Sequence, residues 1–188
     1  MIAAGRARLL LAALSLFAAG CAPAMAQEDE AFMPKGGKTL FLELKDTPRA
    51  AELREIGNLT RTEAEWRSFL TERHKQLGER ELAELAAYLV VNFPLAEGAV
   101  EQAESRNDIG SALPADGREL AWTQCQFCHS LFSGYLMQSR DVQGWRSVFL
   151  SPFHRGLKMT AQQRETFARY SAINMPMKVA DVPAALRY

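Results

Sequence analysis

The chain has 188 residues, of which 48% are hydrophobic and 23% are charged, a composition typical of a folded globular protein and not of a disordered one. Its 22 basic and 22 acidic residues cancel, so no whole-molecule field indicates nucleic acid or an anionic membrane surface as a partner. The sequence contains no glycine-rich phosphate loop, no HExxH and no GxSxG. It therefore gives no support to the enzyme classes that these motifs mark.

The first 26 residues predict an export signal. Arg6 and Arg8 form a basic start, residues 9–19 are an apolar stretch, and residues 24–26 (Ala-Met-Ala) form a cleavage site of small residues. The 11 residues of this stretch are too few to span a bilayer, which takes about 20 apolar residues. We therefore expect an exported, periplasmic protein that begins at Gln27 and carries 20 basic and 22 acidic residues.

An alternative interpretation of the same segment is a lipoprotein signal. Residues 18–21 (Ala-Ala-Gly-Cys) resemble a lipoprotein cleavage box, although the leucine usual in such a box is missing. In that case Cys21 carries lipid, and the protein is anchored to a membrane. A membrane is expected as a partner only in this alternative.

Two segments before residue 113 have clear patterns. In residues 78–93 (GERELAELAAYLVVNF), apolar residues recur at intervals of three and four, which predicts an amphipathic helix. Residues 97–112 contain few large apolar side chains and two glycines, so we expect a linker or a short solvated helix there.

The motif Cys125-Gln126-Phe127-Cys128-His129 has three possible functions. A structural zinc site needs four ligands, usually two pairs, but this chain has one cysteine pair with only three histidines, His74, His129 and His154, to complete it. A thioredoxin-like dithiol follows a strand, whereas residues 116–124 have a helical pattern. Covalent haem attachment uses the whole motif, because two thiols bind the porphyrin and the adjacent imidazole binds the iron. We therefore predict one haem c held by Cys125, Cys128 and His129.

With this motif the sequence resembles the class I c-type cytochromes. The resemblance extends from residue 113 to about residue 176: a helix leads into the CxxCH, a middle helix surrounds Trp145, and a last helix over 160–173 begins with a capping box, Thr160-Ala161-Gln162-Gln163. It implies an all-α, cytochrome c-like fold around one covalently bound haem, in which the first and last helices cross.

The chain also contains an internal repeat. Residues 66–68 and 145–147 are both Trp-Arg-Ser, each preceded five residues earlier by an arginine, Arg61 or Arg140. A Tyr-Asn-Pro set recurs at the same mutual spacing: Tyr88, Asn92 and Pro94 in the first copy, and Tyr170, Asn174 and Pro176 in the second. Because both copies carry the tryptophan and the arginine, we expect Trp145 and Arg140 to serve packing and helix structure.

The alignment places residues 46–50 (Asp-Thr-Pro-Arg-Ala) where the second copy has its CxxCH. The first copy therefore lacks both thiols and the imidazole, and we expect side chains such as Phe41, Leu42 and Leu44 to fill the space of the haem. The predicted organisation is a signal peptide (1–26), a haem-free cytochrome-like pseudo-domain (27–96), a linker (97–112) and a haem domain (113–188).

Several residues compete for the sixth position of the iron. His154 is the prediction, since it lies sixteen residues before Tyr170, roughly where the class I resemblance implies the distal ligand. Met159 is the alternative, because a thioether is the usual ligand of that family, although its place before Thr160 also suits a hydrophobic staple. Met175 and Met177 follow the last helix and would have to fold back, and a vacant sixth position also remains open.

These features predict a periplasmic monohaem cytochrome that carries single electrons. We expect a redox partner protein, such as a periplasmic dehydrogenase, and a downstream acceptor; the haem-free copy is a candidate docking surface for a larger oxidoreductase. The alternatives are a haem-based sensor or peroxidase with an open sixth position, and a structural subunit whose haem only stabilises the fold. Whether the protein is itself an enzyme stays open.

Overall fold

The computed structural model describes residues 30–45, 49–126 and 128–188. Over these residues the chain is helical and contains no strand, which confirms the expected all-α class. No helix in this part of the chain has the length and apolar character needed to cross a membrane. The predicted signal peptide and the alternative lipid site, Cys21, lie outside the described residues.

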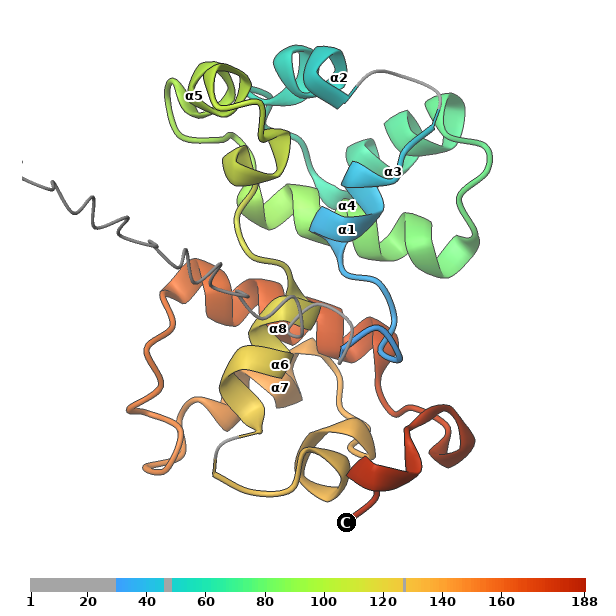
Figure 1. Ribbon diagram of the computed structural model, residues 1–188, viewed down its shortest axis with the longest axis vertical. Helices are drawn as coiled ribbons and strands as arrows, with labels where there is room; N and C mark the ends of the chain where they lie inside the picture. The colour runs from blue at the N-terminus through green and yellow to red at the C-terminus, as the bar shows by residue number, and fades with distance from the viewer. Residues whose placement is uncertain (1–29, 46–48, 127) are drawn as a thin grey trace, which may run out of the picture.

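The helices form two lobes that are stacked along the long axis (Figure 1). One lobe contains α1 (Gly37–Leu42), α2 (Arg49–Ile56), α3 (Glu63–Arg73), α4 (Glu79–Asn92), α5 (Ala99–Ser105) and the 3₁₀ turn η1 (Ile109–Ala112). The other contains α6 (Gly117–Cys125), a π turn η2 (Phe132–Leu136), α7 (Val142–Val148), α8 (Ala161–Asn174) and the 3₁₀ turns η3 (Val179–Asp181) and η4 (Ala184–Leu186). Helices α4 and α8 pack against each other where the lobes meet.

The helices expected from the sequence are present. The pattern over 78–93 is α4, and its apolar residues Leu82, Leu85, Ala86, Leu89 and Phe93 are buried. Helices α6 and α8 match the predictions for 116–124 and 160–173 to within a residue, and the hydroxyl of Thr160 accepts a hydrogen bond from the backbone N–H of Gln163, as a capping box requires.

In both lobes the first helix packs closely against the helix that carries the tyrosine of the repeat, α4 in one lobe and α8 in the other. A Cβ atom added to Gly37 in α1 would lie 2.1 Å from Cβ of Tyr88 in α4, and one added to Gly117 in α6 would lie 2.0 Å from Cβ of Tyr170 in α8. Only glycine permits such an approach. The two contacts are equivalent under the internal repeat, and the second is of the kind that the class I resemblance implies between first and last helices.

Each lobe has its own hydrophobic core, and each core includes a residue from the entering segment of the other lobe. Met33, which precedes α1, is buried in the core of the α6–α8 lobe. Leu113, which precedes α6, is buried in the core of the α1–α5 lobe. The segment before α1 runs down onto the lobe of α8 in Figure 1. The two lobes therefore exchange their entering segments reciprocally.

The two first helices share one capping residue. Asp116 caps its own helix, because its Oδ1 accepts a 3.0 Å hydrogen bond from the N–H of Glu119. Its Oδ2 accepts a 3.2 Å hydrogen bond from the N–H of Thr39 in the first turn of α1. At the equivalent place before α1 stands Gly36, whose added Cβ would lie 2.2 Å from Cγ of Asp116. One carboxylate thus stabilises both helix N-termini.

The first core is filled partly as expected. Phe41 and Leu44 are buried, whereas Leu42 is only half-buried. Helix α2 contributes Leu53 and Ile56, which the sequence did not single out. Of the residues aligned with the CxxCH, 46–48 lie outside the described part of the chain.

The segment 97–112 is more than a linker. Its helix α5 packs against α2, and Ala103 is 1% exposed within the first core. An ion pair of 2.8 Å joins Arg54 of α2 to Glu104 of α5. The short helix foreseen here is therefore part of the first lobe.

Candidate functional site

The CxxCH motif begins at the last residue of α6 and continues into the turn that follows. Cys125 ends the helix and is half-buried, and Cys128 and His129 are exposed. The helix is held in place at its other end by the Asp116 cap and by the contact of Gly117 with Tyr170. The motif thus lies on a helix that is fixed at its start and leads into a turn open to solvent.

Both cysteines and both candidate histidines line one cavity of about 110 Å³. Its remaining walls are mainly apolar and aromatic, and no Asp or Glu of the described part of the chain lines it. The wall residues are Gln124, Gly134, Tyr135, Arg140, Trp145, Val148, Phe149, Phe153, Leu157, Met159 and Phe167. Among the described residues, the lining is therefore mainly apolar and carries one permanent positive charge, that of Arg140.

The rings of His129 and His154 lie close together in an edge-to-face arrangement. Their ring centroids are 6.0 Å apart, and the ring planes make an angle of 77°. The two residues come from different segments, one from the turn after α6 and one from the irregular loop 149–157 that follows α7. Folding therefore brings together the two histidines that the sequence singled out.

Both imidazoles are oriented through Nδ1. The Nδ1 atom of His129 is 3.2 Å from the carbonyl oxygen of Ser130, and that of His154 is 3.1 Å from the carbonyl oxygen of Val148. A ring that donates from Nδ1 to a carbonyl leaves the lone pair of Nε2 available to a metal. The His129 ring also lies against Gly134, where an added Cβ would be 2.3 Å from Nδ1.

The methionines proposed as alternative ligands fall into two groups. Met159 lines the same cavity as the histidines and is 8% exposed. Met175 is buried in the second core, Met177 lines a different pocket near α4 and α8, and neither lines the cavity of the cysteines. The arrangement thus keeps His154 and Met159 as candidates and disfavours Met175 and Met177.

An aromatic cluster forms the inner wall of the cavity. Trp145 lies 5.3 Å from Tyr135 and 5.9 Å from Phe167, measured between ring centroids. The Cζ atom of Arg140 lies 5.7 Å from the Trp145 ring, and Arg61 lies 5.1 Å from Trp66 in the other lobe. This arginine–tryptophan pair is present in both copies, in agreement with a packing role.

The indole Nε1 of Trp145 is buried and has no hydrogen-bond partner among the described residues, and the same holds for Trp66. Near the cavity, a donor of this kind fits an anionic substituent of a bound group. Trp66 has the same unpaired indole N–H in the lobe where no haem is expected. The unpaired N–H of Trp145 is therefore compatible with a bound anionic group but is not specific for one.

The haem-free lobe has a histidine near the place of His154. His74 ends α3, is 1% exposed, and its Nε2 lies 3.4 Å from Oε1 of Glu52 in α2. Glu52 is itself 1% exposed. In this lobe a carboxylate therefore occupies the side of the imidazole that a metal would take.

The chemistry of the cysteines argues against the two other uses of the motif. In the described part of the chain Cys125 and Cys128 form no disulfide, and burial raises the pKa of the Cys125 thiol to about 12. A catalytic dithiol needs a lowered thiol pKa. Among the described residues, no group of three or more His, Cys, Asp or Glu could hold a metal ion, as a zinc site would require.

Comparison with known proteins gave no relative. No protein-family model, no curated protein and no solved structure matches the chain. The likeness to class I c-type cytochromes therefore stays a prediction that depends on residues of this chain alone.

Two contributors to the site were not predicted from the sequence. Gly134 gives room to the His129 ring, and the Val148 carbonyl orients His154. A glycine five residues after the motif histidine is a visible signal, but its purpose depends on the backbone of η2. The Val148 carbonyl has no sequence signal at all.

Proposed function

We infer that this protein is an exported monohaem c-type cytochrome that carries single electrons between other proteins. The observation that supports this most directly is the pair of neighbouring imidazoles, His129 and His154, which line one cavity with Cys125 and Cys128. Every group that covalent haem attachment and two-sided iron ligation require thus comes from one cavity.

The separation of the two histidines fits a metal between them. A metal–imidazole bond is about 2 Å long, and the bonded nitrogen lies about 1 Å from the ring centroid, so two imidazoles on opposite sides of one metal have centroids roughly 6 Å apart. The distance of 6.0 Å agrees with this value. Their Nδ1 contacts favour the tautomer in which Nε2 carries the lone pair.

The cysteines suit covalent attachment. The thiols of Cys125 and Cys128 would form thioethers to the porphyrin, and a thioether needs no thiolate in its final state, so the raised pKa of Cys125 costs the holoprotein nothing. When bound, haem c supplies a one-electron couple between ferric and ferrous iron, and the protein tunes the potential through the axial ligands and burial.

The cavity is smaller than a pocket for an organic ligand. Its volume of about 110 Å³ is below the roughly 300 Å³ at which pockets for organic ligands begin. Residues 149–157 have no regular secondary structure and form the outer side of the cavity. A bound haem therefore needs more room than this cavity has, and residues of the loop other than His154 would have to shift outward to provide it.

The haem-free lobe is a candidate surface for attachment to another protein. Its core is complete without a cofactor, since α2 fills it and Glu52 pairs with His74. It is therefore available as a rigid surface for attachment to a larger oxidoreductase, such as a periplasmic dehydrogenase that donates the electrons. The protein is then an electron-transfer subunit and not a catalyst itself.

Spectroelectrochemistry of the protein, matured in a host that attaches haem c, tests the proposal. We expect one reversible one-electron couple and no change of the ferrous spectrum under carbon monoxide, because His129 and His154 would both bind the iron. The absence of a reversible couple would overturn the electron-carrier function. Ready binding of carbon monoxide or cyanide would favour the sensor or peroxidase instead.

A further inference from the structure

A second cavity, of about 540 Å³, lies between the two lobes and apart from the CxxCH motif. Three segments enclose it: the chain before α1, the first turns of α4, and the end of α8 with the turn that follows. In Figure 1 the chain before α1 passes beside the end of α8. No described residue lines both this cavity and that of the cysteines. Its size is that of a pocket for an organic ligand, for which the range begins at roughly 300 Å³.

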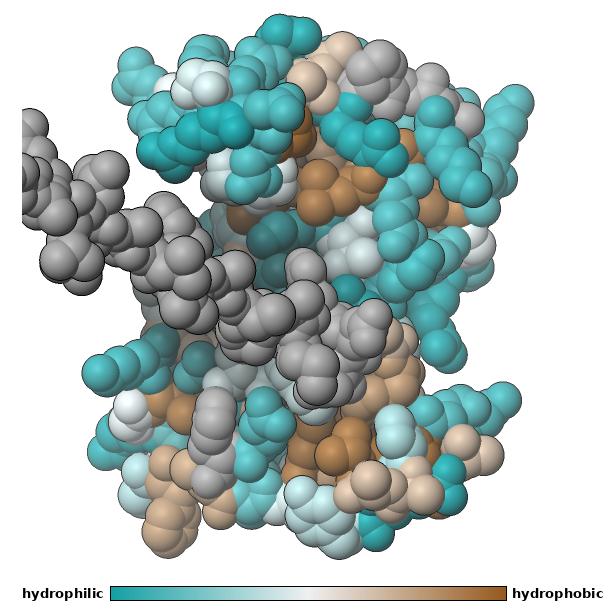
Figure 2. Space-filling model, viewed as in Figure 1, coloured by the Kyte–Doolittle hydropathy of each residue, from teal (hydrophilic) through white to brown (hydrophobic). Residues whose placement is uncertain are grey.

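The two sides of this interlobe cavity differ in chemistry. Helix α4 contributes the ionisable side chains of Arg80, Glu81 and Glu84. The facing side includes Phe32 and Met177, which pack with the core of the α6–α8 lobe. Figure 2 shows the same contrast at the surface, where hydrophilic side chains cover most of the α1–α5 lobe and apolar ones are frequent on the other lobe. The cavity therefore suits a ligand with one polar end and one apolar end.

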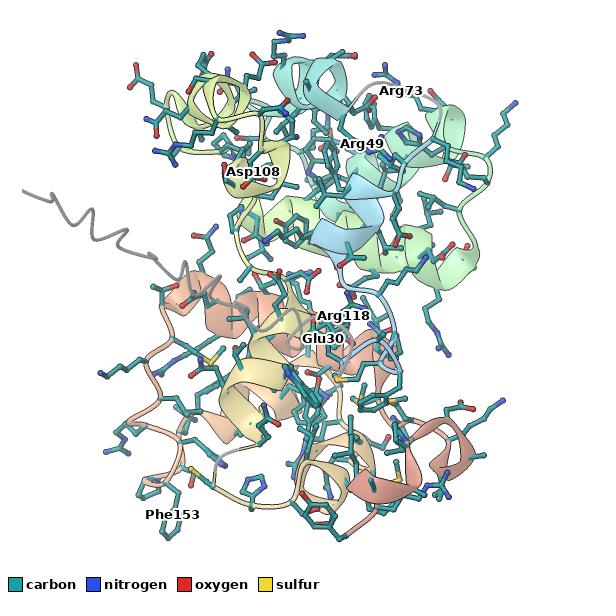
Figure 3. The ribbon with its side chains drawn as sticks, viewed as in Figure 1. Glu30, Arg49, Arg73, Asp108, Arg118 and Phe153 are labelled. Atoms are coloured by element: carbon teal, nitrogen blue, oxygen red, sulfur yellow. The ribbon has the colours of Figure 1, made fainter. Side chains whose placement is uncertain are left out.

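Contacts within the chain hold the apolar side in place. Oε1 of Glu30 lies 3.8 Å from Nε of Arg118, and Figure 3 labels both residues in the region between the lobes. The N–H of Met33 donates a 2.9 Å hydrogen bond to the carbonyl oxygen of Glu30. The turn that carries Phe32 is therefore fixed against the α6–α8 lobe.

Glu84 and Asn174 form the buried polar part of the lining. Glu84 is 2% exposed, Asn174 is 4% exposed, and Oε2 of Glu84 accepts a 3.1 Å hydrogen bond from Nδ2 of Asn174. The same Nδ2 donates a second hydrogen bond, of 3.0 Å, to the carbonyl oxygen of Tyr170. Among the described residues, none donates to Oδ1 of Asn174. The cavity thus contains a buried carboxyl group beside an amide oxygen that can accept a hydrogen bond.

This polar group has an equivalent at the other end of the contact between α4 and α8. Counting from the two tyrosines of the repeat gives three equivalent pairs: Glu84 and Thr166, Arg80 and Gln162, and Asn174 and Asn92. Nδ2 of Asn92 donates a 3.0 Å hydrogen bond to Oγ1 of Thr166, as Asn174 does to Glu84. The two ends therefore share the same asparagine contact.

At the second end the protein itself supplies the donor that the cavity lacks. Nε2 of Gln162 donates hydrogen bonds of 3.1 Å to Oδ1 of Asn92 and 3.3 Å to the carbonyl oxygen of Val91. Arg80, at the place of Gln162, is exposed, and its guanidinium forms no hydrogen bond or ion pair with a described residue. The acceptor in the cavity is therefore free to bind an N–H group of a ligand.

The replacement of Thr166 by Glu84 at the equivalent place favours a cationic donor. An ammonium group beside a carboxylate forms a charge-assisted hydrogen bond, which is stronger than that of a neutral amide. Burial, and next the charge of Asp116, raise the pKa of Glu84 well above its ordinary value. The empty site therefore holds a proton, which passes to the solvent when a bound ammonium group favours the carboxylate.

The other charges of the lining do not oppose a cation. Lys35 forms an ion pair with Glu43. The remaining ionisable residues that line the cavity besides Glu84 are two cations and two anions: Arg80, Lys178, Glu81 and Asp181. Once Glu84 is ionised, the cavity is therefore negative.

We propose that this interlobe cavity binds a small organic compound with a primary ammonium group and a short apolar chain. The ammonium group donates to Glu84 and to Oδ1 of Asn174, in the place that the amide of Gln162 fills at the other end. The apolar chain lies against Phe32 and Met177. The proposal does not depend on the electron-carrier function, because the residues that carry it lie outside the cavity of the cysteines.

Isothermal titration calorimetry of the full-length mature protein with three probes tests the site. Butylammonium has the proposed chemistry, butyltrimethylammonium keeps its charge and chain but has no N–H group, and butyrate has the opposite charge. We expect butylammonium to bind and the other two to bind more weakly by roughly tenfold or more. Failure of butylammonium to bind, or equal affinity for the trimethyl compound or for butyrate, would overturn the proposal.

Two variants test the residues without changing the probe. Glu84→Gln should weaken butylammonium binding by roughly tenfold or more. Arg80→Gln combined with Glu84→Thr reproduces the polar group of the other end, so the new amide should fill the site and abolish binding. The exposed Glu101→Gln on α5 is the control and should keep the wild-type affinity. Wild-type affinity in Glu84→Gln, with its fold checked by circular dichroism, would overturn the site, and the three-probe comparison tests it even if the double variant fails to fold.

Discussion

The hydroxyl of Tyr88 donates a 2.7 Å hydrogen bond to the carbonyl oxygen of Pro114. Its counterpart in the other lobe, Tyr170, donates a hydrogen bond of the same length to the carbonyl oxygen of Pro34. Each proline lies three residues before the first helix of its own lobe, yet the tyrosine that binds it belongs to α4 or α8 of the other lobe. The two copies are therefore joined by a reciprocal pair of hydrogen bonds.

We expect Tyr88→Phe and Tyr170→Phe each to lower the free energy of unfolding by about 1 kcal/mol, since a typical internal hydrogen bond contributes that amount. Urea denaturation followed by circular dichroism measures this. Because the two bonds are equivalent, the two variants should be alike to within about 0.5 kcal/mol. If only one of the two variants lost stability, the two hydrogen bonds between the lobes would not be equivalent.

The glycines beneath these tyrosines should tolerate no side chain. Gly37→Ala and Gly117→Ala each place a Cβ about 2 Å from a tyrosine Cβ, so the helices must separate, and overpacking of this kind costs about 1–3 kcal/mol or more. Thermal unfolding should show clearly lowered midpoints for both. Gly156→Ala is the matched control, because nothing lies within 4 Å of its added Cβ. An unchanged midpoint in Gly117→Ala would contradict the helix contact.

Stability should fall as pH rises because of a carboxyl group buried between the lobes. Burial raises the pKa of Glu84 well above 4.5, and the nearby Asp116 raises it further. The protonated form is the favoured one in the folded state, so its contribution is complete below the unfolded pKa and is lost as pH rises through the folded pKa. The side chain is 2% exposed, and its Oε2 accepts a 3.1 Å hydrogen bond from Asn174.

Glu84→Gln should remove most of this pH dependence, because an uncharged amide can still accept from Asn174. Unfolding free energies compared at about pH 5 and about pH 8 test the effect. The exposed Glu101→Gln on α5 serves as control and should follow the wild type. If Glu84→Gln kept the full slope, another group would be responsible.

The ligand opposite His129 can be identified from ferric absorption spectra. We expect His154→Ala to change the spectrum and the potential, and Met159→Ala to leave bis-histidine ligation intact, because the ring centroids of His154 and His129 are 6.0 Å apart. Bis-histidine ligation also predicts a lower potential than histidine–methionine ligation. A methionine-to-iron charge-transfer band that survives in His154→Ala and vanishes in Met159→Ala would assign the position to Met159.

The local elements could be predicted because their signals are local. The apolar spacing of residues 78–93 and the capping box at Thr160 each depend on a few neighbouring residues, and the structure confirms both. The repeat was visible because Tyr88 and Tyr170 have companions at equal spacing. The structure adds to this their equivalent contacts with Gly37 and Gly117.

Relationships between distant segments could not be predicted. No pattern near Met33 or Leu113 indicates that each is buried in the core of the other lobe. The second cap made by Asp116 depends on the position of α1 beside α6, which is a tertiary contact. The structure makes Gly37 equivalent to Gly117. Counting forward from this pair places the equivalent of the CxxCH at residues 45–49, one residue earlier than the sequence alignment did, because the two copies differ by a small insertion after these glycines. Helix α2 was missed since its buried face is short.

Covalent haem is the central claim, and the mass of the purified, denatured holoprotein tests it most directly. Expressed with the machinery that attaches haem c, the wild type should carry the added mass of one haem that resists acidified organic solvent. The double variant Cys125→Ala with Cys128→Ala should carry none, and the single variants should keep a weaker, one-thioether attachment. A wild-type mass without haem, or a haem that the solvent extracts, would contradict the account.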